Sequence, residues 1–398
     1  MAFGNWLDSP EVERALAKVE GLRDPLAVSS RLRTSLPPPL ARAAASLHQL
    51  RGKAHGKAMD PALRFLTPKG LQQSSAGPVA AYRAQRIAEL APDSLIWDCT
   101  AGIGADSLAL RRRGLRVIAS DLDAQTLACA ASNLAQLGPV HWVVRADARQ
   151  PPCEADVVLL DPDRRPQGTR EGHTERWSPP LNSCLALALE HRGACLKLPP
   201  GMDTARLTGL GKAAHGLQWI SLGGQLREMA LWTGNLVGDL GGQREALVLG
   251  PEGQRGTLRG EPEELQALDP GQLGAVKWLA EPDPAVIRAG LVGPLARKLG
   301  LRPIGPRLAY LGGDQRPSSP LLRSWRVLGT STLDPKRVRA LLREHDVGTL
   351  TVKKRGHPDD AQTLARRFKG PGRQPGLLAV ARLERGHAAL LLEVLDGS

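Results

Sequence analysis

The segment from Leu95 to Asp123, LIWDCTAGIGADSLALRRRGLRVIASDLD, constrains the fold more than any other part of the chain. An apolar strand ends at Asp98, two glycines follow, and a helical pattern leads into a second apolar strand ending at Asp121. Strand, glycine turn, helix and strand form the repeating unit of parallel α/β sheets. The chain is therefore predicted to contain such a sheet, with acidic side chains at the carboxyl ends of its strands.

The same alternation continues along the middle of the chain. Helical patterns such as the one over 124–138 separate the apolar runs. A stretch around 250–265 is rich in Gly and charge and lacks periodicity, which is typical of a linker. The expected strands are 94–98, 115–121, 140–144, 155–161, 194–198, 217–222 and 228–234.

The two ends of the chain differ from this middle part. Residues 1–90 have a helical pattern that opens with a cap at Ser9. After the linker, helices expected at 284–300, 334–345 and 359–369 alternate with strands in a second, smaller α/β pattern. We therefore predict three parts, which are a helical region at 1–90, an α/β domain at 91–252 and a small α/β domain at 266–398.

Positive charge is concentrated at the two ends. The net charge is +13; residues 1–90 carry 13 Lys/Arg against 7 Asp/Glu, and residues 336–373 carry 11 against 4. Such polarity favours a polyanionic partner held by the flanks, although solvated surface charge is the alternative. The candidate phosphate contacts in the tail are Lys353, Lys354, Arg355, Arg366, Arg367 and Lys369.

Several classes of protein are disfavoured. Five widely spaced cysteines form no CxxC pair, and no HExxH motif occurs, so we expect neither a disulfide framework nor a metal site. No apolar run approaches the roughly 18 residues that cross a bilayer, and the charged start is unlike a secretory signal. These features predict a cytoplasmic protein without a membrane partner.

The acids at the strand ends indicate which ligand the sheet binds. Gly102 and Gly104 permit a tight turn and a close approach of a ligand, and a carboxylate at Asp121 can accept both hydroxyls of a ribose. A dinucleotide fingerprint would have glycine where Ser107 stands, and Asp106 would repel a diphosphate. An acid after the first strand suits a cationic ligand instead. An adenosine ligand with an ammonium, a sulfonium and no phosphate fits, which favours S-adenosylmethionine.

These motifs carry a family resemblance. DCTAGIGADSLALRRRG, VIASDLD, RADAR and LLDPDRR resemble the class I S-adenosylmethionine-dependent methyltransferases, and RGKAHGKAM, KLPPGMD, EMALWTG and VKKRG resemble the bacterial subgroup with a THUMP-like C-terminal domain. The resemblance implies a Rossmann-like seven-stranded methyltransferase domain followed by a small α/β THUMP-like domain. It places the loop from Asp98 to Gly104 on the methionine part, Asp121 on the ribose, Asp147 on the adenine and Asp161 beside the methyl group.

The full set of expected cofactor-binding residues follows. Gln73 and Ser75 are included because they could close over the cofactor, although a simple helix cap is the alternative. The set is Asp98, Thr100, Ala101, Gly102, Gly104, Asp106, Asp121, Leu122, Asp147, Asp161, Gln73 and Ser75.

The acceptor side is expected at DPDRRPQG, residues 161–168. Enzymes that methylate exocyclic base nitrogens often have Asp/Asn-Pro-Pro-aromatic here, whereas this chain has Asp163 and Arg164 at the last two positions. The change removes the stacking ring; Arg164 could instead stack or clamp a phosphate, or pair with nearby acids. Asp161 or Asp163 would act as a weak base, and Trp177 is either a stacking residue or part of the core.

A covalent mechanism is disfavoured, because Cys153 precedes the fourth strand and Cys99 resembles a small buried hydrophobe. Direct in-line methyl transfer is therefore expected. THUMP domains are associated with RNA-modifying enzymes, so the resemblance implies structured RNA, tRNA or rRNA, as the substrate. The alternatives are a protein or small-molecule acceptor, or a non-catalytic RNA-binding module. The acceptor atom and the oligomeric state stay open.

Overall fold

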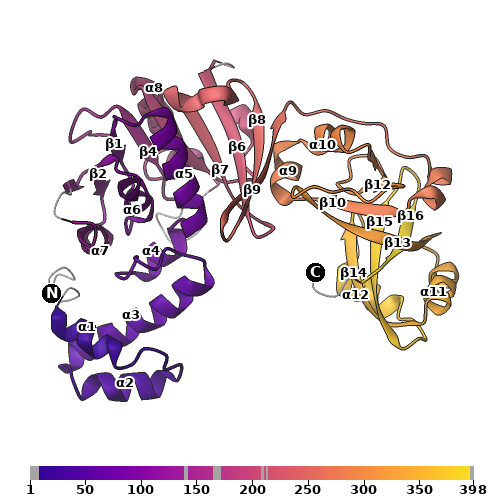
Figure 1. The fold of residues 1–398 in the computed structure, drawn as a ribbon, viewed down its shortest axis with the longest axis horizontal. Helices are drawn as coiled ribbons and strands as arrows, with labels where there is room; N and C mark the ends of the chain where they lie inside the picture. Colours follow the sequence, from indigo (N-terminus) through magenta and orange to yellow (C-terminus); the bar gives the residue numbers. More distant parts are fainter. Residues whose placement is uncertain (1–8, 139–141, 165–171, 208–209, 212–213, 395–398) are drawn as a thin grey trace. The chain divides into compact units, whose positions relative to one another are not determined.

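The computed structural model of the chain describes residues 9–138, 142–164, 172–207, 210–211 and 214–394 (Figure 1). The backbone divides into two compact units. The first comprises residues 1–218, 228–242 and 249–254, and the second comprises residues 219–227, 243–248 and 255–398. No helix in the described ranges is long and apolar enough to cross a membrane.

Within the described residues, five helices precede the first strand, in the region where the sequence predicted a helical pattern. They are α1 (Pro10–Ala17), α2 (Pro25–Arg33), α3 (Pro38–Gly56), α4 (Pro68–Gln73) and α5 (Gly77–Leu90). Ser9 caps α1, because its side-chain oxygen accepts a hydrogen bond from the Val12 amide at 3.2 Å. Val12 and Leu32 share one buried apolar cluster with Ile103 and Leu108, which follow the first strand. The helical region therefore shares a core with the part of the chain that carries the glycine loop.

The first sheet contains the seven expected strands and two more. Its order is β3-β2-β1-β4-β5-β7-β6-β8-β9. Strands β1 to β5 run parallel, and β7 is antiparallel to β5. Helices α6 (Ala105–Arg112), α7 (Ala124–Ala135) and α8 (Leu181–Glu190) connect the parallel strands. The strands are β1 (Leu95–Asp98), β2 (Arg116–Asp121), β3 (Trp142–Arg145), β4 (Val157–Leu160), β5 (Gly193–Leu198), β6 (His215–Leu222), β7 (Gln225–Gly234), β8 (Arg244–Gly250) and β9 (Gly253–Gly260).

The prediction of a linker around 250–265 is wrong in part, because β9 occupies half of this stretch. Strand β9 is at the edge of the sheet. Most of its side chains are partly or fully exposed, and Leu258 is its one buried residue. A strand that is solvated on both faces has no apolar alternation, so the sequence gives no period-2 signal.

The second sheet belongs to the C-terminal part of the chain. Its order is β11-β12-β10-β13-β16-β15-β14, with β14 parallel to β15. The helix expected over 284–300 is divided in two at Gly290, which has a φ of 77°. The elements are β10 (Trp278–Pro282), α9 (Pro284–Ala289), α10 (Val292–Lys298), β11 (Arg302–Pro303), β12 (Leu311–Gly313), β13 (Leu322–Thr332), α11 (Pro335–Glu344), β14 (Val347–Arg355), α12 (Ala361–Arg367), β15 (Gln374–Arg382) and β16 (His387–Leu392).

Helices α11 and α12 cover one face of this second sheet. Val338 and Leu342 from α11 join Leu364 and Phe368, from α12 and its end, in a single cluster with strand residues of β14, β15 and β16. Other side chains of the sheet, such as Trp325, belong to a separate cluster. Short 3-10 helices complete the fold at Thr174–Arg176, Thr204–Arg206, Asn235–Leu240 and Pro270–Ala275.

Candidate active site

The carboxyl ends of the parallel strands meet at one edge of the first sheet. Chain order reverses between β1 and β4, which is where open α/β sheets bind their ligands. Asp98 ends β1, Asp121 ends β2, and Asp161 follows β4 directly. The structure therefore brings these three predicted residues to a common edge.

The glycine loop after β1 is tied to the acid that ends β2. Gly102 and Gly104 have φ values of 57° and 86°, and Gly104 caps α6. The amides of Gly102 and Asp123 each donate to one carboxylate oxygen of Asp121, both at 2.9 Å. Burial raises the pKa of Asp121, although these two amides oppose the shift. Each carboxylate oxygen retains acceptor capacity for a hydroxyl.

The rest of the loop is held between β2 and β4. The Ala101 amide donates to the Ser120 carbonyl at 2.9 Å, and the Asp161 amide donates to Thr100 Oγ1 at 2.6 Å. Leu122, next to Asp121, is 48% exposed although it is apolar. An exposed apolar side chain beside Asp121, the acid predicted to hold a ribose, would suit the face of an adenine.

Asp98 is buried and its carboxylate accepts a hydrogen bond from Ser107 Oγ at 2.6 Å. Burial raises the pKa of Asp98 to about 7, with the charge of Asp106 adding to the shift and Ser107 opposing it. A carboxylate that is costly to ionise gains from a cation at contact distance. The Asp98 site therefore fits the ammonium end of S-adenosylmethionine.

Asp106 belongs to a buried ion network that sequence reasoning did not find. Its carboxylate pairs with Arg83 of α5 and lies 3.3 Å from Lys197 Nζ of β5. Arg83 also pairs with Glu228, and Lys197 with Asp161. Burial alone would favour the neutral acid, but the two cations outweigh it and lower the pKa of Asp106. The signal was a lysine within the apolar segment ACLKL, because a buried strand seldom has an unpaired charge.

Ser75 also belongs to this network. Its hydroxyl donates to Asp106 Oδ2 at 3.1 Å and accepts from Lys197 Nζ at 2.9 Å. Gln73 instead reaches the acceptor-side loop, where its Nε2 donates to Asp163 Oδ1 at 2.7 Å. Neither contact is the simple helix cap considered above. Closure of these two residues over a cofactor stays a prediction.

Two side chains of helix α4 bind the carboxylate of Asp163. Lys69 Nζ lies 2.9 Å from Asp163 Oδ2, and Gln73 takes the other carboxylate oxygen. The Asp163 backbone also pairs with Ser178, with N–O distances of 2.8 and 3.0 Å. A carboxylate engaged on both oxygens is poorly placed to remove a proton, so this geometry favours a structural role over the predicted catalytic one.

Helix α4 is itself anchored on two sides. Lys57 Nζ donates to the carbonyls of Leu71, Gln72 and Ser74 at 2.7–2.9 Å. A Cβ atom on Gly70 would lie 2.2 Å from Cγ2 of Ile103, the residue between the two loop glycines. The N-terminal region therefore forms one wall of the candidate site.

Other predicted acceptor-side residues have mixed outcomes. Arg164 is partly buried, and residues 165–168 of the motif lie outside the described part of the chain. Trp177 is 5% exposed, so the structure supports its core alternative and not a stacking role.

Cys99 and Cys153, the two cysteines considered as nucleophiles above, are poor candidates for that role. Burial raises the pKa of the Cys99 thiol well above its ordinary value, and it also raises the pKa of Cys153. Because the thiolate is the reactive form, both shifts support direct transfer.

Asp147 forms an ion pair with Arg149, 2.6 Å away, which helps to lower the pKa of Asp147.

The predicted RNA-binding residues do not share one environment. Lys353 and Arg355 lie on one face of β14 and both pair with Glu281, at 2.7 and 2.9 Å. Lys354 points to the other face and is exposed, as are Arg366 and Arg367 of α12. The geometry therefore favours the exposed residues as phosphate contacts.

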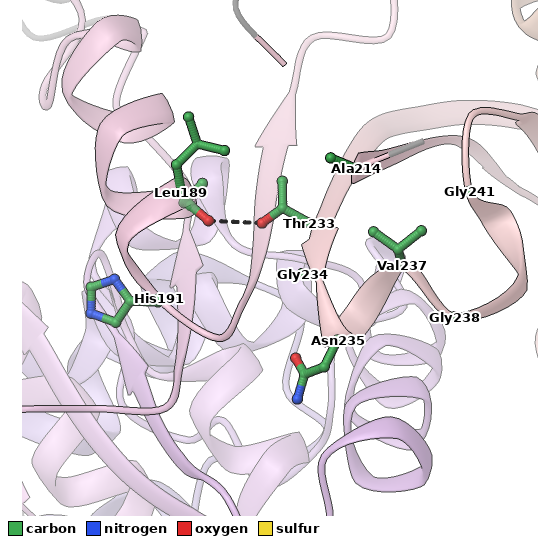
Figure 2. Close-up of a pocket in the computed structure, with 10 residues that line it drawn as sticks. Leu189, His191, Ala214, Thr233, Gly234, Asn235, Val237, Gly238 and Gly241 are labelled. Atoms are coloured by element: carbon green, nitrogen blue, oxygen red, sulfur yellow. Dashed lines mark hydrogen bonds between the residues drawn. The ribbon is translucent and has the colours of Figure 1, made fainter. Parts of the chain in front are cut away.

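A hollow of about 560 Å³ lies elsewhere on the first unit (Figure 2). Its lining includes His191, Thr233 and Asn235, and the Thr233 hydroxyl donates to the Ala188 carbonyl at 2.9 Å. Gly193 begins β5 and pairs with Gly234 at the end of antiparallel β7. The hollow therefore lies at the amino edge of the sheet, away from the acids.

Among the described residues, no group of three or more His, Cys, Asp or Glu could hold a metal ion.

The chain is similar to one family model and to several known proteins. The family model for a THUMP domain-like region matches residues 322–393. Two curated relatives from Mycobacterium tuberculosis strains CDC 1551 / Oshkosh and ATCC 25618 / H37Rv are both named as uncharacterized S-adenosylmethionine-dependent methyltransferases. Each is 36% identical to this chain over 322 residues, covering 81% of this chain and 86% of the relative.

A solved structure shows the same fold. The crystal structure of a candidate methyltransferase from Porphyromonas gingivalis W83 has a TM-score of 0.72 and 18% identity, covering 98% of this chain and 99% of that one. The predicted family and cofactor are thus confirmed. The chain belongs to the family of S-adenosylmethionine-dependent methyltransferases and has a THUMP-like domain in its C-terminal part.

Proposed function

We propose that this enzyme methylates structured RNA, tRNA or rRNA, by direct transfer of the methyl group. The observation that carries the proposal is the set of exposed cations on α11 and α12, two helices that lie within the THUMP-like segment and on one face of its sheet. Cations of this kind contact phosphates without reading sequence. The exposed residues are Lys336, Arg337, Arg339, Arg343, Arg366 and Arg367.

The carboxyl edge of the first sheet supplies the cofactor site in this proposal. Bound S-adenosylmethionine would supply a methyl group already activated on a sulfonium. Asp98 would hold its ammonium, the loop from Thr100 to Gly104 its methionine part, Asp121 its ribose, and Leu122 and Asp147 its adenine. The buried Asp98 with a pKa near 7 and the tethered glycine loop support this assignment.

Compartment and domain limits are also part of the proposal. All five cysteines are free thiols, and four of them are buried, which suits the reducing cytoplasm. We keep the predicted domains at 1–90, 91–252 and 266–398, except that β9 extends the sheet of the second domain to Gly260. A protein or small-molecule acceptor remains the second candidate, because Glu281 already pairs with two of the tail cations.

The RNA proposal is tested by the salt dependence of RNA binding in the full chain. Replacing Arg337, Arg339, Arg366 and Arg367 with Gln should weaken tRNA binding. It should make the slope of log K against log salt shallower by about 0.7–0.9 per lost phosphate contact. Arg255 and Arg288 are exposed cations outside the matched segment, so their Gln variants are the control. An equal effect in both variants, or no effect in either, would contradict the proposal.

A further inference from the structure

Lys197 is a buried cation at the carboxyl edge to which the proposed cofactor site assigns no contact. It lies one residue before the end of β5, and its side chain is 7% exposed. Its ammonium pairs with Asp161, reaches Ser75 Oγ at 2.9 Å and lies 3.3 Å from Asp106 Oδ2. Three acceptors thus face the three N–H donors of an ammonium, so the geometry of the group is fully determined.

The network continues behind Lys197 as a chain of alternating charges. Asp106 pairs with Arg83, and Arg83 pairs with Glu228. The side chains of these three residues are at most 12% exposed, whereas that of Asp161 is 30% exposed. The buried members therefore fix one end of the chain, and Asp161 is the end that faces the edge of the sheet.

The charge state of Lys197 agrees with this geometry. Burial would lower the pKa of Lys197, but the carboxylates of Asp161 and Asp106 outweigh burial, and the pKa lies above its ordinary value. Lys197 is therefore an ammonium and not a proton acceptor. Removal of one partner from a buried ion network leaves an uncompensated charge, so Asp161 depends on Lys197 for its orientation.

We propose that Lys197 is a positioning residue that holds Asp161 as a hydrogen-bond acceptor for the methyl acceptor, whose reacting atom is a nitrogen that carries hydrogen. This inference rests on the proposed methyl transfer and narrows its acceptor. Because Lys197 holds Asp161 Oδ2, the carboxylate offers its acceptor capacity in a fixed orientation. Both oxygens of the neighbouring Asp163 are engaged by α4.

The chemistry of a nitrogen acceptor matches these groups. The nitrogen attacks with its own lone pair and forms the N–C bond, while the C–S bond breaks and sulfur keeps the bonding electron pair. The nitrogen then loses its proton to water, so no strong base is required before the attack. A ribose hydroxyl must instead lose its proton during the attack. Asp163 is not placed to take it, because both of its oxygens are engaged by α4, and Asp161 Oδ2 is held by Lys197.

The positioning role is tested with three variants of the full chain. Labelled S-adenosylmethionine is offered to RNA, protein and metabolite fractions of a cell extract, and the fraction that accepts label from the parent is used for kinetics. Lys197→Met should lower kcat on the order of 100-fold, as expected for a misplaced reacting group. It should leave KM and the Kd of S-adenosylhomocysteine within about threefold. Lys197→Arg, which keeps the charge, should recover at least about tenfold of the lost kcat.

Arg86→Met is the matched control. Like Lys197, Arg86 is a buried cation, but it lies in α5. It donates to the carbonyls of Leu236 and Val237 at 3.0 and 2.8 Å, and none of these contacts involves the ion network around Lys197. Its loss should reduce stability without changing kcat. If Lys197→Met keeps the parental kcat, or loses cofactor affinity in parallel with kcat, the positioning role is overturned.

The acceptor atom is read from the same labelled product by digestion and mass spectrometry. Label on a nitrogen supports the inference, and label on a ribose oxygen or a ring carbon overturns it while leaving the RNA proposal intact. Label on a nitrogen of a protein or metabolite would overturn the RNA proposal and leave this inference standing. A parent enzyme that labels no fraction contradicts both.

Discussion

Replacing Gly70 with Ala tests whether α4 packs directly on the cofactor loop. The added Cβ atom would lie 2.2 Å from Ile103 Cγ2 and 2.9 Å from Thr67 Oγ1. Ile103 is 1% exposed, so its side chain has little room to move away. The backbone of either α4 or the loop between Gly102 and Gly104 must therefore shift.

Two effects of opposite sign determine how Gly70→Ala changes the free energy of unfolding. An alanine gains about 1 kcal/mol over glycine inside a helix, whereas overpacking in a dense core costs about 1–3 kcal/mol. Since real contacts seldom fall below about 3 Å, we expect the cost to lie at the upper end. The net destabilisation should be about 1–2 kcal/mol. Displacement of the loop should also weaken S-adenosylhomocysteine binding about tenfold, or about 1.4 kcal/mol.

Urea unfolding and calorimetry measure the two quantities. Gly52→Ala is the control, because nothing lies within 4 Å of a Cβ atom at that position in α3; it should raise stability. Ile103→Ala removes the clashing methyl group, so Gly70→Ala should cost less in that background. If Gly70→Ala behaves like Gly52→Ala and binds the cofactor normally, α4 does not pack on the loop.

Four further outcomes are expected. Asp121→Ala should weaken S-adenosylhomocysteine binding on the order of 100-fold in calorimetry, since charge-assisted hydrogen bonds contribute about 1.5–3 kcal/mol each; parental affinity would contradict its ribose role. The pKa of Asp98 is about 7, and an ammonium beside it would favour the carboxylate form. The affinity for S-adenosylhomocysteine should therefore rise by up to about tenfold per pH unit up to pH 7. Asp98→Asn should abolish this rise. Lys353→Ala should lower stability by about 1 kcal/mol or less in urea unfolding, because its pair with Glu281 is partly exposed, and RNA binding should be unchanged. Cys99→Ser and Cys153→Ser should both retain methyl transfer; an inactive but folded variant would revive a covalent mechanism.

The sequence predicted the strands and helices around β1 to β7 because a buried strand or helix face leaves a periodic pattern of apolar residues in the sequence. The seven strands from β1 to β7 were expected from their apolar runs, and Ser9 was expected as a cap from the polar residue before a helical pattern. The glycine loop and Asp121 were expected from the acid and glycine spacing. Strands β8 and β9 and helix α4 were not expected. Strand β8 is buried, but its apolar run leads into the Gly-rich segment predicted as a linker. An exposed edge strand and a six-residue helix have no apolar period.

The partners of the charged residues could not be predicted in the same way. Nothing local links Arg83 to Glu228, 145 positions later, or Lys197 to Ser75, 122 positions earlier. The partners of the cations near the C-terminus could not be predicted from the sequence either. Lys353, Lys354 and Arg355 form one basic run in the sequence, but strand alternation sends Lys354 to the opposite face, and Glu281 of β10 binds the other two.

Labelled methyl transfer to fractionated cell extract tests the proposed function most directly. The full chain is incubated with labelled S-adenosylmethionine, at a concentration near the Kd of the parent, and with separate RNA, protein and metabolite fractions. Asp121→Ala, which should bind the cofactor on the order of 100-fold more weakly, serves as the control. We predict label in the RNA fraction, sensitive to ribonuclease and lost in the control. Label confined to the protein or metabolite fraction would contradict the account.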